Sequence, residues 1–375
     1  MTTTAHHSNI DLEYQKLIKH ILDNGENVEP ARIGLAGTRK IFGYQYKVDL
    51  LDNNNNFILP MITVNALKFA DLTTELDWFI SGDTNIKFLV DRGCNFWTDD
   101  AYAYYCNKFK KNDKTPKDFN VWKASIGLKT DIIEDVNKIT HTYGDCGSQY
   151  GKIWRGIKSG DIDQLYTLID NINKNPTSRR HLLVSDLPNE RENLALYWCH
   201  SLFQVNCTEI DPVTRLKLWS KKMKHSETFA DSYLSNHSIE QVSAYCELLG
   251  APKYYIDGHL YQRSADVMLG VPYNTASYSL LLNFIANITN MIPRRFIHSF
   301  GDVHIYNDHI LKAKIILDRK PKILPKLIIK KDLKNYDIKD SLTLIKQEGL
   351  VSIFKLINYN PELRINFKLH TQAKK

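Results

Sequence analysis

The chain has 375 residues, of which 43% are hydrophobic and 24% are charged, and this composition excludes disorder over most of its length. A formal net charge of +7 permits anionic partners, but part of the basic excess lies in clusters such as 319–331, which favours a solvated surface over a nucleic-acid interface. The six cysteines include no CxxC pair, and no apolar run reaches the length of a signal-peptide core or a membrane span. We therefore expect a cytoplasmic protein with no membrane contact and no metal site.

The apolar pattern predicts alternating helices and strands along the chain. Residues 11–24 carry apolar side chains at helical spacing, and a strand is predicted over 44–51. A buried helix then ends at Ile80, because Ser81 and Gly82 interrupt its period. Further helices are predicted over 160–174, 238–250 and 275–289, and further strands over 181–187, 259–267 and 296–306. No repeat or low-complexity linker divides residues 1–375, so we expect a single α+β domain.

One candidate nucleophile lies in the run LALYWCHSLFQ, where Cys199 and His200 are surrounded by apolar and aromatic residues. An unpaired cysteine in such surroundings is more often a small buried hydrophobe than a reactive thiol. The run alone leaves both interpretations open.

Arginines at three separate places change this balance. Arg32 lies in the Gly-containing loop RIGLAGTRKIFG, which either binds phosphate or turns the chain. Arg179 and Arg180 are adjacent, and two side-by-side guanidinium groups suit bidentate binding of a phosphate. Arg263 lies in YQRSADVMLGVPYNTASYSLL. Together with the candidate thiolate, these arginines suggest a site for a phosphorylated substrate.

The order of the motifs resembles that of the thymidylate synthase superfamily over about residues 28–371. The motifs are RIGLAGTRKIFG, ELDWFISGDTNIKFL, YGDCGSQYGKIWR, SRRHLLVS, ALYWCHSLFQ, YQRSADVMLGVPYNTASY and GDVHIYNDH. The long motif around Arg263 together with an upstream Cys-His pair is the most specific part. The resemblance implies a mixed β-sheet with helices packed on it and a homodimer that forms sheet to sheet.

The resemblance also implies the chemistry of the site. Cys199 matches a thiolate that adds to C6 of dUMP, so that C5 becomes nucleophilic enough to attack 5,10-methylenetetrahydrofolate. The phosphate-binding arginines would supply the positive charge that this thiolate needs. Glu75 matches the acid that organises water and proton transfer at the base and the departing folate. His200, Asp266 and Tyr150 complete the expected catalytic set.

Other motif positions imply contacts with substrate and cofactor. Arg32 and Arg263 would hold the nucleotide phosphate in one subunit, while Arg179 and Arg180 would reach across from the partner. The remaining substrate-binding candidates are Gln204, Ser264 at the phosphate, Asn274 at the pyrimidine edge, and His304 and Tyr306 at the sugar. The folate side would be lined by Trp97, Asp266, Leu269 and Gly270. Packing alone would explain Trp97, Leu269 or Tyr150, whereas ionisable groups such as Glu75, Asp266 and His304 would be costly in apolar runs without a polar task.

Departures from the family pattern lie on the cofactor side. A polar end, HTQAKK from His370, replaces the small apolar terminus that helps a synthase to exclude water, Asp99 and Asp100 replace an acidic-aromatic pair, and Asp308 replaces a usual Asn. We therefore expect a phage-type dUMP hydroxymethylase, in the host cytoplasm if viral, that yields 5-hydroxymethyl-dUMP and tetrahydrofolate. The alternative is a thymidylate synthase, which yields dTMP and dihydrofolate.

Two further functions are less favoured. A dCMP hydroxymethylase is disfavoured because Asn274 suits uracil, whereas a carboxylate there would suit cytosine. The unusually long spacing between Cys199 and Arg263 indicates an insertion at about 207–256. The basic character of this insertion suggests an RNA-binding regulator, but the presence of Cys199, Glu75 and His304 argues against that role. We favour a surface elaboration for that insertion over a docking or nucleic-acid site, and expect a variable surface segment at about 100–143.

Overall fold

The computed structural model describes residues 9–30, 36–111, 115–134, 139–156, 161–223 and 227–370. Its centre is a six-stranded sheet in which β7 and β8 run parallel and every other neighbouring pair is antiparallel. The strand order is β1 (Glu26–Val28), β2 (Thr38–Asp49), β8 (Ile292–Tyr306), β7 (Tyr254–Asp266), β6 (His200–Glu209) and β5 (Leu182–Val184). This mixed sheet with packed helices confirms the predicted α+β class.

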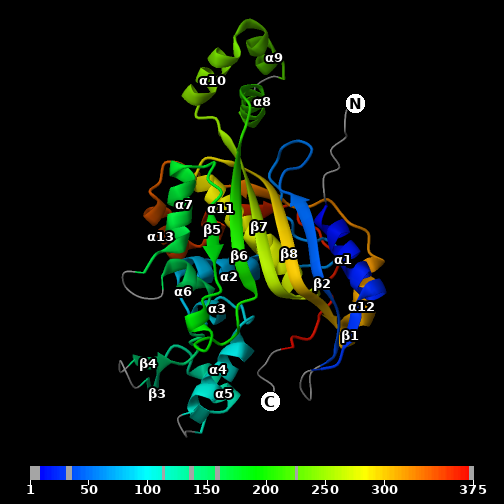
Figure 1. Ribbon diagram of the computed structural model, residues 1–375, viewed down its shortest axis with the longest axis vertical. Coiled ribbons are helices and arrows are strands. Elements are labelled where there is room, and N and C mark those ends of the chain that lie inside the picture. The colour runs from blue at the N-terminus through cyan, green and yellow to red at the C-terminus, as the bar shows by residue number, and fades with distance from the viewer. Residues whose placement is uncertain are drawn as a thin grey trace.

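The parallel pair at the centre of the sheet needs a crossover, because parallel strands cannot be joined by a tight turn. Helix α11 (Gly270–Ile288) makes this connection, and nearly all its residues are buried. It lies behind the sheet in Figure 1, together with α2 (Phe69–Ser81). The apolar run that predicted a long helix is therefore a helix enclosed by the core rather than an amphipathic one.

The remaining helices of the main body pack around this centre. Helices α6 (Tyr150–Arg155) and α13 (Ile338–Glu348) pack against α2, and α7 (Gln164–Lys174) packs against both of them. At the opposite edge, α1 (Ile10–Asn24) packs against β2, and α12 (Ile310–Leu317) packs against α1. A second hairpin pairs β9 (Lys326–Ile329) with β10 (Phe354–Ile357). Short 3-10 helices are η1 (Pro188–Glu190), η2 (Asn307–His309) and η3 (Leu350–Ser352).

Residues 87–142 form a substructure at one end of the molecule. It contains α3 (Lys87–Val90), α4 (Thr98–Lys111), α5 (Phe119–Ala124) and the hairpin of β3 (Lys129–Glu134) with β4 (Ile139–Thr142). Tyr105 and Trp122 are buried in the same apolar core as the main body. The Tyr- and Lys-rich composition gave no clear period, because aromatic packing rather than a regular apolar stripe holds this part together.

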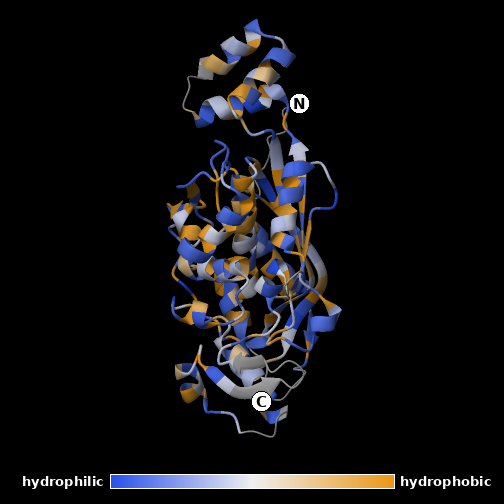
Figure 2. Cartoon of the chain, turned by 90° about the vertical axis from the view of Figure 1, so that its left-hand side faces the viewer, coloured by the Kyte–Doolittle hydropathy of each residue, from blue (hydrophilic) through white to orange (hydrophobic). Residues whose placement is uncertain are grey.

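The insertion between β6 and β7 forms three helices at the other end of the molecule. These are α8 (Pro212–Lys222), α9 (Glu227–Asn236) and α10 (Ile239–Leu248), and they project from the main body in Figures 1 and 2. They have a small apolar cluster of their own, which includes Leu216, Val242 and Cys246. Buried Arg215 donates to the backbone oxygens of Ala251 and Pro252 and so ties α8 to the chain that re-enters the sheet.

The predicted elements differ from the structure mainly at two starts. Strand β2 begins at Thr38, within the stretch assigned to the loop RIGLAGTRKIFG, and helix α2 begins later than its apolar pattern. The apolar pattern extends back to Val64, but the helix begins only at Phe69. The backbone N–H groups of Leu67 and Lys68 donate instead to the hydroxyls of Tyr359 and Tyr273, at 2.9 and 3.1 Å. Tertiary hydrogen bonds thus delay the start of the helix. None of the helices within the described ranges combines the length and apolar character that crossing a membrane requires.

Candidate active site

Cys199 lies directly before β6, where Arg263 of β7 holds the chain around it. The backbone N–H of Arg263 donates to the Cys199 carbonyl oxygen at 2.8 Å. Its guanidinium donates to the carbonyl oxygens of Trp198 and Tyr197, at 2.6 and 2.9 Å, and lies 4.5 Å from the centre of the Tyr197 ring. The cation is therefore fixed beside the residues that carry the thiol.

The thiol of Cys199 is held in a poorly solvated position. Burial is the largest effect and raises the pKa of the thiol, and the negative charge of Asp100 raises it further. The Arg263 guanidinium has the opposite effect and lowers this pKa. Its Sγ lies 3.7 Å from the Tyr197 carbonyl oxygen. Because only the thiolate is a strong nucleophile, the site needs more positive charge than Arg263 alone provides.

Tyr150 holds both residues of the Cys-His pair by their backbone. Its hydroxyl oxygen accepts hydrogen bonds from the N–H groups of Cys199 at 2.8 Å and His200 at 3.1 Å. The rings of Tyr150 and His200 stack with centres 4.8 Å apart. Burial lowers the pKa of His200 to about 3, so this ring is neutral at physiological pH and does not supply the missing charge.

Glu75 projects from α2 and is bound by Trp97. The indole N–H of Trp97 donates to Oε1 of Glu75 at 2.7 Å. Burial raises the pKa of Glu75 to about 7, with the Trp97 hydrogen bond lowering it and Asp71 raising it further. A carboxyl group with this pKa is available in both protonation states near neutral pH, as a general acid or base requires.

Asn274 belongs to a buried chain of polar side chains. Its Nδ2 donates to Oε1 of Gln262 at 3.2 Å, and the same oxygen lies 3.0 Å from Nε2 of His298. Nδ1 of His298 lies 3.0 Å from the hydroxyl of Thr275. Gln262 also donates to the Ser264 carbonyl oxygen at 3.0 Å. The orientation of the Asn274 amide is therefore set by partners behind it.

Gln262 and His298 are functional candidates that the sequence prediction missed. Both lie in predicted strands and are almost fully buried, at 2% and 0% exposure. The available signal was a polar residue within a predicted strand, because a polar side chain that is buried needs a hydrogen-bond partner. The partner of each could not be read from the sequence, because Gln262 and His298 lie on different strands.

The ends of β7 and β8 bring the expected sugar and folate candidates close together. Asp266 accepts hydrogen bonds from the N–H groups of Met268 and Leu269 at 2.8 and 3.3 Å, where Leu269 and Gly270 begin α11. Burial raises the pKa of Asp266, and His304 opposes this shift. Nδ1 of His304 lies 2.7 Å from Asp302, and the ring centres of His304 and Tyr306 are 5.3 Å apart.

Other predicted residues lie away from the Cys199 thiol. Arg179 and Arg180 are exposed between α7 and β5, and in the described parts of the chain their side chains form no ion pair. Gln204 lies on β6 and its Nε2 is 3.5 Å from the Arg179 carbonyl oxygen. Arg32 lies outside the described residues, so its expected phosphate contact stays a prediction.

Comparison with known proteins identifies relatives over nearly the whole chain. A family model described as thymidylate synthase matches residues 12–371. A thymidylate synthase of Mycoplasma mobile is 35% identical over 328 residues, which cover 87% of this chain and 91% of the relative. One from Listeria monocytogenes is 36% identical over 332 residues, covering 84% and 89%, and one from Mycoplasma pneumoniae is 32% identical over 334 residues, covering 89% and 94%.

These relatives contradict the expected hydroxymethylase activity and give no support to a phage origin. All three are named thymidylate synthase, and each aligns with this chain over most of its length. The expectation relied on the polar C-terminal sequence from His370, on the premise that a polar end does not exclude water from the site. The structure places the side chain of His370 at only 3% exposure, against Asp308 and the ring of Tyr306. The side chain of the one described residue of this end is therefore buried, and residues 371–375 lie outside the described part of the chain.

Proposed function

The chain belongs to the thymidylate synthase family of one-carbon transferases, and we propose that it converts dUMP to dTMP with 5,10-methylenetetrahydrofolate as co-substrate and dihydrofolate as second product. The observation that carries the proposal is the position of Tyr150. Its hydroxyl binds the backbone of Cys199, and its ring centre lies 6.1 Å from that of Trp97, which holds Glu75. A candidate nucleophile and a candidate acid-base group are thus connected through Tyr150 and Trp97.

Cys199 begins the proposed reaction. Its thiolate forms a bond to C6 of the uracil, and the C5=C6 electron pair moves toward the C4 carbonyl, so that C5 becomes an enolate carbon. C5 then attacks the methylene carbon of the bound folate. Loss of the C5 proton and cleavage of the bond between that carbon and the folate nitrogen leave an exocyclic methylene on the base and release tetrahydrofolate. Hydride transfer from tetrahydrofolate to the methylene carbon gives the methyl group and dihydrofolate, restores the C5=C6 double bond and expels the Cys199 thiolate. Arg263 and the nucleotide-bound arginines favour the thiolate against the burial that raises its pKa.

Glu75 is proposed to move protons at the C4 carbonyl of the base. At a pKa of about 7 it can donate a proton as negative charge develops on that oxygen and recover it later in the cycle. The Trp97 N–H keeps the carboxyl group in one orientation. Asp266, Leu269 and Gly270 are proposed to line the folate side together with Trp97.

Asn274 is proposed to select uracil. One of its amide N–H groups is donated to Gln262. This leaves the other N–H for O4 and the amide oxygen for N3–H of the base, which is the pattern that uracil presents. Cytosine presents the opposite pattern at these two atoms. The sugar and phosphate contacts of His304, Tyr306, Ser264, Gln204 and Arg32 are proposed by motif position.

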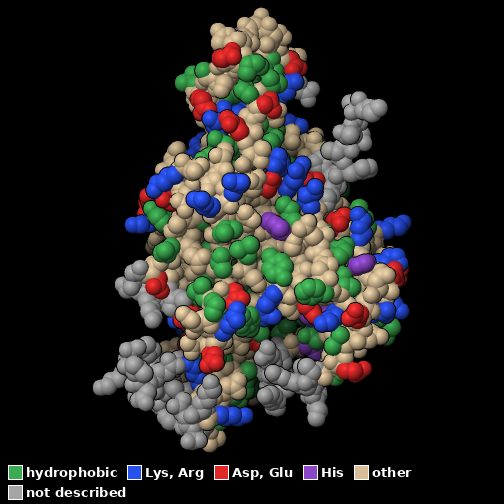
Figure 3. Space-filling view, viewed as in Figure 1, with side chains coloured by type: hydrophobic (Ala, Val, Ile, Leu, Met, Phe, Trp, Pro, Cys, Tyr) green, Lys and Arg blue, Asp and Glu red, His purple; other side chains and the backbone are tan. Residues whose placement is uncertain are grey.

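We further propose a homodimer formed through the open face of the sheet. Figures 1 and 3 show this face without a covering helix over β6, β7 and β8, and hydrophobic side chains gather near its middle. Tyr261 is 41% exposed there, and the Ser299 hydroxyl forms hydrogen bonds with Gln45 and His259 at 2.6 and 2.8 Å. A self-complementary face of this kind suits a twofold interface. Arg179 and Arg180 would then complete the partner's phosphate site.

The absorbance rise on dihydrofolate formation tests the proposed reaction. We expect turnover with dUMP and methylenetetrahydrofolate, and none in Cys199→Ser. Cys106→Ser is the matched control, because Cys106 is also a partly buried free thiol but lies in α4 away from Arg263. Equal loss in both variants, or turnover that survives Cys199→Ser, would contradict the assignment.

A further inference from the structure

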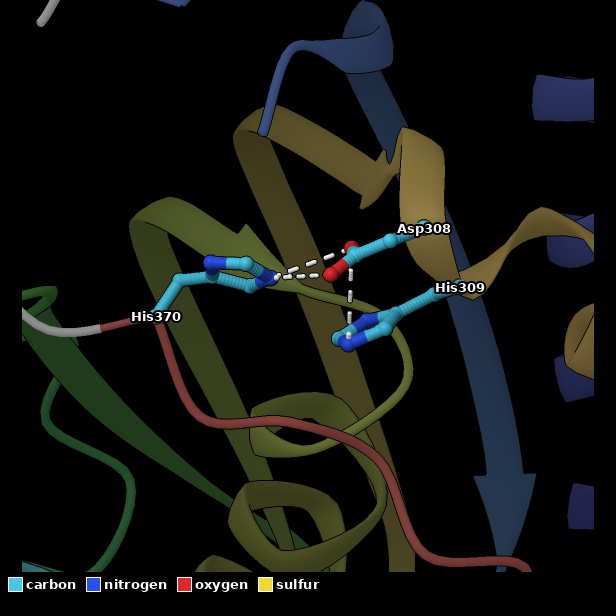
Figure 4. Close-up of side chains that lie close together, drawn as sticks. All are labelled: Asp308, His309 and His370. Carbon is cyan, nitrogen blue, oxygen red and sulfur yellow. Dashed lines mark hydrogen bonds and ion pairs between the residues drawn. The ribbon is translucent and has the colours of Figure 1, made fainter. Parts of the chain in front are cut away.

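Three potential metal ligands meet where the C-terminal segment returns to the end of β8. Asp308 and His309 lie in η2, directly after β8, and His370 lies 62 positions further along the chain. Figure 4 shows the three side chains, here named the 308/309/370 cluster, pointing toward one another from these two segments. The cluster combines two imidazoles and one carboxylate.

The distances in the cluster are close to those of a coordination shell. Nε2 of His370 lies 3.0 and 3.1 Å from the two carboxylate oxygens of Asp308, and Nε2 of His309 lies 3.8 Å from Oδ1. One potential ligand atom from each residue lies within 4.8 Å of the other two. Ligand atoms in a tetrahedral zinc site with bonds of about 2.0–2.1 Å are roughly 3.3–3.5 Å apart, so small side-chain rotations would suffice.

His309 is the independent observation that points to a ligand. Its side chain is 1% exposed, and neither ring nitrogen has a hydrogen-bond partner among the described residues. A buried imidazole without partners is costly and calls for an explanation such as a bound ion. The ion pair between His370 and Asp308 does not provide one, because it leaves both nitrogens of His309 unsatisfied.

The surroundings hold the rings in place but leave one side open. The ring centres of Tyr306 and His370 are 4.1 Å apart, and those of Phe367 and His309 are 5.1 Å apart. The side chain of Asp308 is 40% exposed, so water can reach the cluster from that side. The site can therefore supply three protein ligands and admit a solvent ligand.

We propose that Asp308, His309 and His370 bind one divalent transition-metal ion of the Zn²⁺ type and so fasten the C-terminal segment to the end of β8. Two imidazole nitrogens and one carboxylate suit zinc or cobalt, whereas magnesium and calcium prefer oxygen ligands. Two of the ligands, Asp308 and His370, are positions at which the sequence departs from the family pattern. The ion plays no part in the reaction at Cys199, so the proposal is independent of the proposed function.

Cobalt titration of the chelator-treated full-length protein tests this site directly. We expect one equivalent of Co²⁺ to bind with the visible absorption of a four- or five-coordinate ion, and Zn²⁺ to displace it. Asp308→Asn, His309→Gln and His370→Gln should each weaken binding at least tenfold, since even residues that only support a ligand contribute about 10- to 100-fold. Zn²⁺ should also raise the melting temperature of the wild type but not of these variants.

Two controls distinguish this site from adventitious binding. His237→Gln removes an exposed histidine on the insertion and should bind cobalt as the wild type does. A variant with both His6 and His7 replaced by Gln should do the same. Circular dichroism establishes whether each variant is folded. If His309→Gln does not fold, the single variants Asp308→Asn and His370→Gln are sufficient for the test. Absence of binding, binding that survives the cluster substitutions, or binding lost with His6 and His7 would overturn the proposal.

Discussion

The hydroxyl of Tyr150 accepts a hydrogen bond from the backbone N–H of Cys199 at 2.8 Å, so a helix of the core fixes the position of the candidate nucleophile. The same oxygen accepts from His200. The hydroxyl is therefore a direct means of testing whether the position of Cys199, rather than its presence alone, matters.

Tyr150→Phe should lower both stability and activity. The N–H groups of Cys199 and His200 lose their acceptor, and each buried group left unsatisfied costs about 1–3 kcal/mol in the free energy of unfolding. We expect kcat/KM to fall roughly 10- to 100-fold as Cys199 shifts, equivalent to about 1.4–2.7 kcal/mol. Denaturant unfolding and steady-state kinetics measure the two effects. Tyr336→Phe, at an exposed tyrosine, is the control, and unchanged kinetics in Tyr150→Phe would refute the positioning role.

The pH dependence of activity should report Glu75. Because burial raises the pKa of Glu75 to about 7, kcat/KM should show a limb near that pH that is absent in Glu75→Gln, with turnover reduced about 100-fold or more. Trp97→Phe removes a hydrogen bond that lowers this pKa, so the limb should move to higher pH. A limb that stays in place in both variants would assign it to another group.

Stability should depend on pH through the same carboxyl group. The folded-state pKa of Glu75 lies above its ordinary value of 4.5, so its contribution to stability is fully present below 4.5 and is lost as the pH rises through about 7. Burial also raises the pKa of Asp77 to about 7, with the same sign. The decline in unfolding free energy from pH 5 to 8 should therefore become smaller, but not vanish, in Glu75→Gln. An unchanged decline would contradict the shifted pKa.

Asn274→Asp should reverse part of the preference for the base. A carboxylate cannot donate to O4 of uracil, and the lost hydrogen bond should reduce kcat/KM for dUMP roughly 5- to 150-fold. It can accept from the amino group of cytosine, so dCMP should lose less or gain. Competition between the two nucleotides, followed by chromatography of the products, measures the ratio. Equal losses for both would show that Asn274 does not read this edge.

Subunit mixing tests the shared phosphate site. Cys199→Ser and the double variant Arg179→Ala/Arg180→Ala should each be nearly inactive alone. If the arginines act across the interface, random mixing should restore roughly a quarter of the wild-type activity, because half of the dimers contain one intact site of two. No recovery after refolding the mixture would place the arginines in their own subunit's site or outside any site.

The sequence predicted the order of elements well because their apolar periods are local. Helix α11 and strands β7 and β8 follow directly from such patterns. Contacts between distant positions could not be derived in this way. The pairing of Gln262 with His298 and the contact of His370 with Asp308 depend on which segments the fold brings together. The hydroxymethylase prediction, which the thymidylate synthase relatives contradict, also relied on a polar sequence whose burial a local pattern does not reveal.

The mass of the nucleotide product is the most direct test of the central claim. The protein is incubated with dUMP and 5,10-methylenetetrahydrofolate, and the nucleotides are separated and weighed by mass spectrometry. We predict dTMP, formed in step with an equal amount of dihydrofolate. A nucleotide that carries a hydroxymethyl group alongside tetrahydrofolate, or unchanged dUMP with folded protein, would contradict the proposed function.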